Sequence, residues 1–416
     1  MCWLERTNRA TQHITHNAYI IMIKRVAMIG WEFPPFISGG LGVHCLMLTR
    51  ELSRSGAGVD FYMPRMDEGG VGSHHSHLKI IEVPASGGIN PYPLTKKNYD
   101  SNFFAAVEEY NARVVESFES FDAEVVHCHD WITVKAGIEI NRRYGIPLVL
   151  TIHSTEYDRS AFFMPQDWII DVEREGMNTA DAVIAVSNWT KNMLMDKYGI
   201  PSVKIYAVYN GIDVSAFARV GGRDYEQGGK RVLFLAQLTR QKGPRYFITA
   251  AKKVLDEVGD AEFVVAGKGE MLGELIELSL ELGIPHRIRF VGFVPDDEIM
   301  DLYNDSEVYV LPSVSEPFGI SILEAMASGL PVVVSDSTGV GEALKNALKV
   351  PYWDTDEMAN KIIALLKSRE LRECIGNSGK TECRKFTWAK CANETMRVYE
   401  SAVQAANGIV GNEGGG

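Results

Sequence analysis

The sequence lacks any pattern of paired cysteines. It holds six cysteines among 416 residues, with no C-x-x-C pair and no spacing typical of metal ligands. A disulfide-stapled secreted fold and a small zinc module are therefore excluded, and we expect a cytoplasmic protein whose thiols stay reduced. Long apolar runs are absent as well. No stretch approaches the ~20 residues that cross a bilayer, and residues 1–21 contain no apolar core of a secretory signal.

An excess of positive charge is also lacking, as are two common ligand-binding signatures. The chain has 42 lysine and arginine residues against 54 aspartate and glutamate residues, a net charge of -12. This balance argues against nucleic acid or an anionic membrane as the main partner. No G-x-G-x-x-G stretch follows a strand pattern, so a dinucleotide fingerprint is not supported. No D-x-D pair stands at a strand end, and we expect neither a metal ion nor a cofactor. The oligomeric state stays open.

The chain does have length and a regular alternation of predicted elements. At 416 residues it exceeds one ordinary core, so two domains are expected. Strands are predicted at 24–30, 58–63, 79–83, 123–128, 147–152, 181–186, 203–208, 230–236, 262–266, 288–293, 308–311 and 332–335. Helical patterns separate many of them and fill 355–405. This alternation is typical of α/β domains with parallel, doubly wound sheets.

Composition marks the domain boundaries. The stretch 220–229 has four glycines and several charges, which is the composition of a linker. We therefore predict domains at 22–219 and 230–388, followed by a last helix at 389–405. Residues 1–21 are expected to form an extension outside the fold, and the glycine-rich end, 406–416, a flexible tail.

A glycine-rich turn follows the first strand, at the edge of the sheet where such folds bind ligands. Gly39, Gly40 and Gly42 stand between strand 24–30 and a helical pattern. Backbone can approach an anion closely at such a turn. The alternative is a structural turn that only packs helix on strand.

Histidines mark two further strand ends. His127 lies near the end of strand 123–128 and His129 directly follows it, and with Asp130 they could suggest a metal site. A third and fourth ligand at the usual spacing are missing, so we predict none. His153 follows strand 147–152, where it is either a ligand-contacting residue or a satisfied core histidine.

The second half repeats the order of strand, turn and helix. Lys242 stands near a helix start, where it can hold a phosphate as a point charge or simply face solvent. Glu316 precedes Pro317, which biases its backbone away from helix and places it in the loop after strand 308–311. Glu324 lies on the helix that follows. Open backbone amides and the helix dipole between the two carboxylates favour negative charge, so this stretch suits a ligand that carries both hydroxyls and phosphates.

These stretches, in this order, resemble the retaining glycosyltransferases of family 4, above all the glycogen and starch synthases. The resemblance rests on Gly-Gly-Leu-Gly 39–42, His-Asp-Trp 129–131, Thr-Ile-His 151–153, Leu-Thr-Arg-Gln-Lys-Gly 238–243 and the Glu-x7-Glu stretch 316–324. It covers nearly all of residues 22–405. It implies a GT-B fold, in which two Rossmann-like doubly wound domains face each other across a cleft and the last helix crosses back to the first domain.

The resemblance also implies roles for individual residues. Glu316 would hold donor sugar hydroxyls and face the reacting centre, and His153 would position the sugar. Lys242 would carry the departing diphosphate without a metal. Glu324 would hold the ribose hydroxyls. The implied substrate-binding set is Gly39, Gly40, Gly42, Gln237, Gly267, Gly269, Phe318, Gly319, Ile320 and Glu324.

The chain departs from the family pattern at two positions. Ile37 stands where glycogen synthases have a lysine, two residues before the glycine pair, which argues against a bacterial-type ADP-glucose site. Gln237 replaces an arginine that holds the diphosphate. A hydrogen bond to a charged group contributes about 1.5–3 kcal/mol, so its loss in the transition state slows a reaction roughly 10- to 150-fold.

The function implied is hexosyl transfer, with retention, from a nucleotide-diphosphate sugar such as UDP- or ADP-glucose to a glucan or other sugar acceptor. Elongation of an α-1,4-glucan fits the group resembled most. Mannosyl or sucrose-type transfer is the nearest alternative. A nucleotide-sugar epimerase and a non-catalytic sugar-binding protein on the same fold also stay open.

Overall fold

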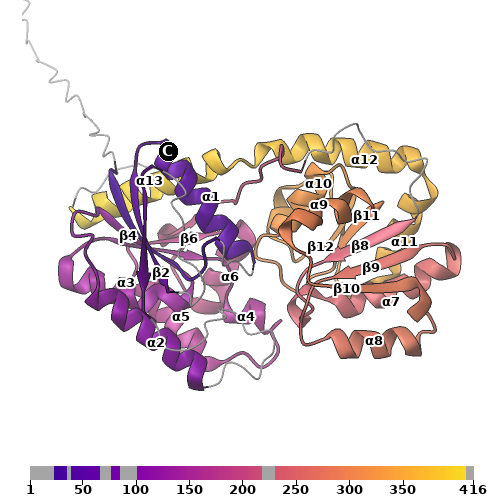
Figure 1. The fold of residues 1–416 in the computed structure, drawn as a ribbon, viewed down its shortest axis with the longest axis horizontal. Coiled ribbons are helices and arrows are strands. Elements are labelled where there is room, and N and C mark those ends of the chain that lie inside the picture. The colour runs from indigo at the N-terminus through magenta and orange to yellow at the C-terminus, as the bar shows by residue number, and fades with distance from the viewer. Residues whose placement is uncertain (1–22, 35–38, 66–75, 85–100, 218–229, 409–416) are drawn as a thin grey trace, which may run out of the picture.

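The computed structural model describes residues 23–34, 39–65, 76–84, 101–217 and 230–408. Two α/β domains lie side by side, each built on one parallel sheet (Figure 1). Within the described ranges no helix is long and apolar enough to cross a membrane. The predicted extension 1–21, the linker 220–229, Ile37 and the tail from 409 onward lie outside the described residues.

The first sheet has seven strands in the order β3-β2-β1-β4-β5-β6-β7, all parallel. β1 lies between β2 and β4, with Val26 opposite both Val59 and Val125. The strands are β1 (Arg25–Ile29), β2 (Gly58–Pro64), β3 (Leu78–Val83), β4 (Val125–His129), β5 (Leu148–Ile152), β6 (Ala182–Ala185) and β7 (Ile205–Ala207). β4, β5 and β6 are buried along their whole length, which is why they read as continuous apolar runs.

Helices cover both faces of this sheet. α2, α3 and α5 lie together on one side, and α1 lies on the other (Figure 1). The first-domain helices are α1 (Gly40–Arg54), α2 (Ser101–Glu116), α3 (Trp131–Tyr144), the one-turn α4 (Glu156–Arg159), α5 (Asp167–Thr179), α6 (Asn188–Tyr198) and the 3₁₀ helix η2 (Ser202–Lys204).

The second sheet has six parallel strands in the order β10-β9-β8-β11-β12-β13. They are β8 (Arg231–Leu235), β9 (Glu262–Ala266), β10 (Ile288–Gly292), β11 (Val308–Leu311), β12 (Val332–Ser335) and β13 (Leu348–Val350). The helices are α7 (Pro244–Glu257), α8 (Leu272–Glu281), α9 (Asp296–Asn304), α10 (Ile320–Ala327), α11 (Thr355–Lys367), α12 (Arg369–Glu382) and α13 (Trp388–Ala406), with 3₁₀ helices η3 (Arg240–Lys242), η4 (Pro285–Arg287), η5 (Val340–Ala343) and η6 (Cys383–Lys385).

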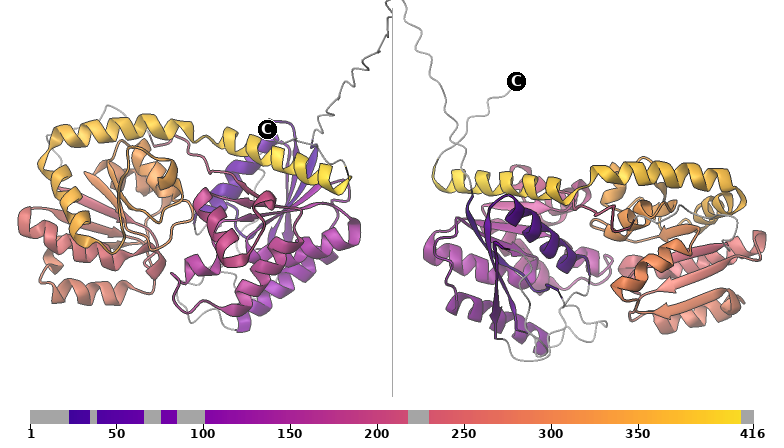
Figure 2. Two further views of the ribbon diagram at one scale, coloured as in Figure 1. Left: turned by 180° about the vertical axis from the view of Figure 1, so that it is seen from behind. Right: turned by 45° about the horizontal axis from the view of Figure 1, so that its top comes forward.

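The last helices join the two domains. α12 runs along the second domain, and α13 continues onto the first, where it packs on α1 and on β4 to β6 (Figures 1 and 2). The buried side chains of α13, including Trp388 and Tyr399, belong to the first hydrophobic core. The chain crosses between domains at two adjacent points, because the N–H of Ile212 donates to the carbonyl of Phe386 at 3.0 Å.

The predicted α/β class is confirmed, and each predicted strand is present within a few residues of its expected bounds. The prediction did not mark the helices α4, α6, α8 and α9 or the strand β13. α6 buries only Thr190, Met193, Leu194 and Tyr198, so its apolar stripe is narrow and interrupted by polar residues. β13 has three residues, two of them half-buried, which is too short for a period to be recognised.

The crossing point leaves no room for a side chain at Gly211. A Cβ atom there would lie 2.2 Å from the backbone nitrogen of Trp388. We expect Gly211→Ala to lower the free energy of unfolding by about 2 kcal/mol or more, because overpacking against backbone typically costs 1–3 kcal/mol. Thermal unfolding measures the loss. Gly273→Ala is the control, since nothing lies within 4 Å of its Cβ position and alanine favours helix; equal destabilisation of both variants would contradict the prediction.

Candidate active site

An ion pair between the two loops of the second domain lies at the centre of the candidate site. Lys242, the last residue of η3 after β8, places Nζ 2.7 Å from Oε2 of Glu316, in the loop after β11. Ser313 Oγ donates to the same carboxylate oxygen at 3.3 Å. The Glu316 side chain is 8% exposed and that of Lys242 20%. Two predicted residues 74 positions apart in the sequence are thus brought together.

Backbone hydrogen bonds hold Glu316 in place. Its N–H donates to the carbonyl of Ser337 at 2.8 Å, and its own carbonyl accepts from the N–H of Gly339 at 2.7 Å. These bonds form a parallel bridge between Glu316 and Thr338. The loop after β11 is therefore tied to the loop after β12, and the carboxylate has a fixed direction.

α10 begins directly after this loop. Gly319 precedes it with φ 99°, a left-handed conformation that L side chains rarely adopt. A Cβ at Gly319 would also lie 2.7 Å from a methyl carbon of Ile322. Both observations explain why a glycine stands between the loop that carries Glu316 and the first helical residue, Ile320. The N–H of Ile322 donates to the carbonyl of Gly319 at 3.1 Å, and the helix N-terminus favours negative charge nearby.

Glu324 lies one turn into α10 and is half-buried. The hydroxyl of Tyr303, on α9, donates to its Oε2 at 2.9 Å. Burial is the largest cause, and Glu324 the next, of the strongly raised pKa of that tyrosine. The phenol therefore stays protonated and acts as a permanent donor to the carboxylate.

Glu324 offers a second testable prediction. If it accepts hydrogen bonds from donor ribose hydroxyls, Glu324→Gln keeps the shape but weakens charge-assisted bonds that contribute about 1.5–3 kcal/mol. We expect KM for the donor to rise about 10-fold or more with kcat changed less, since binding in ground and transition states is lost together. Steady-state kinetics measure this. A fall in kcat at unchanged KM would place Glu324 at the reacting centre instead.

His153 follows β5 and is half-buried in the first domain. Its Nε2 lies 3.0 Å from Nδ1 of His129. The carboxylate of Asp130 accepts from the backbone N–H of His153 at 2.6 Å, and Asp130 itself has φ 58°. Strained backbone of this kind persists where the surroundings over-determine it. Asp130 thus positions the loop that carries His153.

Burial lowers the pKa values of the four histidines at this edge of the first sheet. It lowers the pKa of His44 to about 4 and that of His127 to about 3. It also lowers the pKa values of His129 and His153 well below the usual range. These imidazoles are neutral at neutral pH, so His153 can exchange hydrogen bonds with a sugar without adding charge.

Contacts between the domains bring the two halves of the site together. Ser315 Oγ, next to Glu316, donates to Oδ1 of Asp158 at 2.5 Å. Asp158 lies on α4, in the segment after His153, and α4 contacts η3, which carries Lys242. The Ser187 hydroxyl donates to the carbonyl of Pro317 at 2.6 Å. The strand ends that carry His153, Lys242 and Glu316 therefore meet where the two domains touch.

Comparison with known proteins decides the family. Residues 38–216 match the model described as Glycosyltransferase Family 4, and residues 224–382 match Glycosyl transferases group 1. The chain is 33% identical over 403 residues to the uncharacterised glycosyltransferase MJ1607 of Methanocaldococcus jannaschii, covering 91% of this chain and 99% of the relative. The chain is a glycosyltransferase. A 30% identity over 410 residues to the alpha-maltose-1-phosphate synthase of Mycobacterium tuberculosis, covering 90% of this chain and 98% of that one, agrees.

Solved structures establish the fold of this glycosyltransferase. Sucrose-phosphate synthase from Thermosynechococcus elongatus superimposes with a TM-score of 0.75 at 20% identity, covering 90% of this chain and 98% of that one. Both domains and their arrangement are therefore of the GT-B type, as the sequence predicted.

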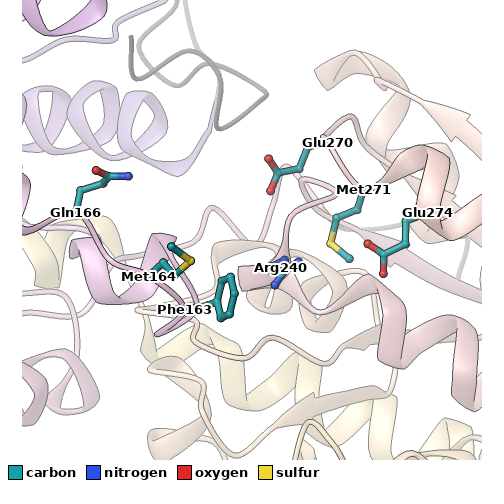
Figure 3. A pocket seen from close by; sticks show the side chains of 7 residues that line it. All are labelled: Phe163, Met164, Gln166, Arg240, Glu270, Met271 and Glu274. Atoms are coloured by element: carbon teal, nitrogen blue, oxygen red, sulfur yellow. The ribbon is translucent and has the colours of Figure 1, made fainter. Parts of the chain in front are cut away.

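The glycosyltransferase has a pocket of about 470 Å³ between its domains (Figure 3). Phe163, Met164 and Gln166 line it from the first domain, and Arg240, Glu270, Met271 and Glu274 from the second. The Arg240 guanidinium lies 4.8 Å from the centre of the Phe163 ring. Three residues in the loop at 161–164 have positive φ. This pocket was not predicted from the sequence, because most of its lining comes from loops and short turns that no periodic pattern marks, with Glu274 added from α8.

Several glycines of the predicted substrate-binding set have a structural reason to be glycine. A Cβ at Gly267 would lie 1.9 Å from the carbonyl oxygen of Ala236, and one at Gly269 2.3 Å from that of Leu238. The N–H of Gly267 already donates to the carbonyl of Gly292 at 2.7 Å. These glycines let the loops after β8, β9 and β10 pack closely.

The remaining predicted residues lie on loops and helix starts that face each other across the domain contact. Gly39 and Gly40 are exposed at the start of α1, and Gly42 is buried in its first turn. Gly40 lies near Ile320 of the other domain, since a Cβ there would be 3.4 Å from its terminal methyl. Phe318 is 4% exposed, and Gln237 is half-buried after β8. The N-termini of α1 and α10 thus face the same space between the domains.

Proposed function

We propose that this glycosyltransferase moves a glucosyl unit, with retention, from a nucleotide-diphosphate glucose to a glucan acceptor. The observation that carries the proposal is the Lys242–Glu316 pair, 2.7 Å apart and next to the contact between the domains. A cation and a carboxylate held together there match the two polar parts of a sugar nucleotide. The lysine can bind the diphosphate, and the carboxylate can accept hydrogen bonds from the sugar hydroxyls.

The pair supports a mechanism in which the donor replaces an internal contact. Without donor, each charge of the pair satisfies the other. With donor bound, the diphosphate takes Lys242 and the sugar hydroxyls take Glu316. As the bond from C1 to the departing phosphate oxygen breaks, the acceptor hydroxyl oxygen bonds to C1 on the same face and its proton passes to that phosphate oxygen. The nucleoside diphosphate leaves, and Lys242 and the N-termini of α1 and α10 stabilise the negative charge that grows on it. His153 orients the sugar, and closure of the domains excludes water.

The names of two relatives suggest which acceptors to compare. Relatives of the chain are named glycogen synthase and alpha-maltose-1-phosphate synthase, both from Mycobacterium tuberculosis. A glucan and a sugar phosphate are therefore the two acceptor classes to compare. Maltose 1-phosphate contains one glucosyl unit more than glucose 1-phosphate, so glucose 1-phosphate is the matching test acceptor for the second class.

The experiment is nucleotide release from UDP-glucose, ADP-glucose and GDP-mannose, each without acceptor, with glycogen and with glucose 1-phosphate. Glycogen-stimulated release from a glucose donor supports the proposal and identifies the base. Release that requires glucose 1-phosphate keeps glucosyl transfer and replaces the glucan. Release from GDP-mannose alone would replace the hexose. A changed sugar nucleotide without any acceptor would indicate an epimerase, and binding without turnover would indicate a non-catalytic protein.

A further inference from the structure

Three histidines from three elements meet at the strand-end edge of the first domain. His44 lies on α1, His129 ends β4 and His153 follows β5. One ring nitrogen from each lies within 4.8 Å of those of the other two. His44 is 3% exposed and His129 0%, and His153 is half-buried. This group could not be predicted from the sequence, where His127 and His129 stand together, because its members are far apart in the chain.

The hydrogen bonds of this group differ from those of the neighbouring His127, which has a purely structural role. His127 uses both ring nitrogens, Nε2 with Thr151 Oγ1 and Nδ1 with the Tyr399 hydroxyl, each at 2.7 Å. His44 differs, since its Nε2 is buried without a hydrogen-bond partner among the described residues. A buried polar atom without a partner costs about 1–3 kcal/mol, so a ligand that engages this nitrogen would be favoured.

The neighbouring groups prepare the cluster for a cation. Nδ1 of His44 lies 2.7 Å from Oδ1 of Asn210. A hydrogen bond to the amide oxygen needs the proton on Nδ1, which leaves the lone pair of Nε2 directed away from Asn210. Metal-ligating histidines are generally fixed in this way by an outer partner. Asp130, which accepts from the backbone N–H of His153, adds a carboxylate beside the group.

We propose that His44, His129 and His153 bind one divalent transition-metal ion of the zinc class. Three imidazoles and one open position for water form a known type of tetrahedral zinc site, and imidazole suits zinc, copper, nickel and iron more than magnesium or calcium. Zinc–nitrogen distances of ~2.0–2.1 Å place tetrahedral ligand atoms about 3.3 Å apart. Nδ1 of His129 and Nε2 of His153 are 3.0 Å apart already, so rotation of side chains completes the site.

The ion would act as an inhibitor of transfer. This consequence rests on the proposed function, in which His153 positions the sugar. An ion that ties His153 to His44 and His129 removes that imidazole from the sugar. Binding of the ion itself depends only on the three side chains, so the two statements can fail separately.

The test uses the full chain without a histidine tag, freed of metal and titrated with Co²⁺ and then Zn²⁺. We expect one ion per chain, with the intense visible absorption of tetrahedral cobalt, and displacement by zinc. His44→Gln and, as a second variant, His129→Gln should bind at least 100-fold more weakly. His286→Gln is the matched control, since His286 is exposed on η4. Thermal unfolding without metal confirms that each variant is folded.

The outcomes are distinct. Tetrahedral binding that both variants lose and the control keeps supports the site. Weak octahedral cobalt binding that His44→Gln does not change would mean an adventitious ion only and would overturn it. In transfer assays, zinc should slow the wild type, but not His44→Gln relative to its own metal-free rate. Zinc bound at the site with transfer unaffected would overturn the inhibitory role. An absence of transfer under every condition would count against the proposed function and leave the cobalt result to decide the site.

Discussion

Glu316→Gln should lower kcat about 100-fold while leaving the fold intact. Glutamine keeps the size of the side chain and its hold in the loop, which comes from backbone bonds to Ser337 and Gly339. What is lost is the negative charge that faces Lys242 at 2.7 Å and that would accept donor hydroxyls. A hydrogen bond to a charged group is worth about 1.5–3 kcal/mol, or roughly 10- to 150-fold in rate when it is lost in the transition state.

The measurement is initial-rate kinetics with the donor that the wild type uses best, together with thermal unfolding. Glu357→Gln is the matched control, because Glu357 forms a half-buried pair with Lys361, four residues on along α11, and helix pairs of this kind contribute little. If kcat of Glu316→Gln stays within a factor of about three of the wild-type value, this carboxylate does not face the reacting sugar.

Lys242→Met should have the larger effect, a fall in kcat of about 10²- to 10³-fold. The change keeps an unbranched chain of similar length and removes the positive charge. Loss of one preorganised group that stabilises developing negative charge typically costs about 2.7–4 kcal/mol. Because Gln237 stands where the resembling family has an arginine, more of the diphosphate charge should depend on this lysine.

A comparison of variants separates catalysis from structure. Lys252→Met, on α7, removes a lysine that pairs with Asp256, and it should leave the rate unchanged. The double variant Lys242→Met, Glu316→Gln should lose much less than the product of the two single effects, since residues that act as a unit are not additive. Full additivity, or a Lys242→Met variant with normal kcat and only a raised KM, would contradict the role of Lys242 in the transition state.

The fold could be predicted because parallel strands buried on both faces stand out as apolar runs between helical patterns. β9, β11 and β12 have the bounds expected from the sequence. What escaped prediction was short or weakly patterned, as with β13 and α6. The family resemblance depended on the order of the motifs along the chain. No single motif was decisive, because each one alone has an ordinary structural explanation.

The candidate site was predictable only in part. Glu316, Lys242 and His153 were named from their strand ends, and parallel topology does bring such ends together. Their partners were not predictable, because long-range contacts have no sequence spacing. Ser315 with Asp158 spans 157 positions, and His44 with Asn210 spans 166. The positive φ of Asp130 also gave no signal, since aspartate is common at turns without it.

The central claim is glucosyl transfer with retention at this site, and the most direct test is a proton NMR time course of the reaction. The best donor from the release panel is incubated with its acceptor, beside Lys242→Met. We expect the first-formed product to carry an α-linked glucosyl unit from an α-linked donor, at a rate that the variant reduces about 10²- to 10³-fold. A β-linked product, or transfer that Lys242→Met leaves unchanged, would contradict the claim.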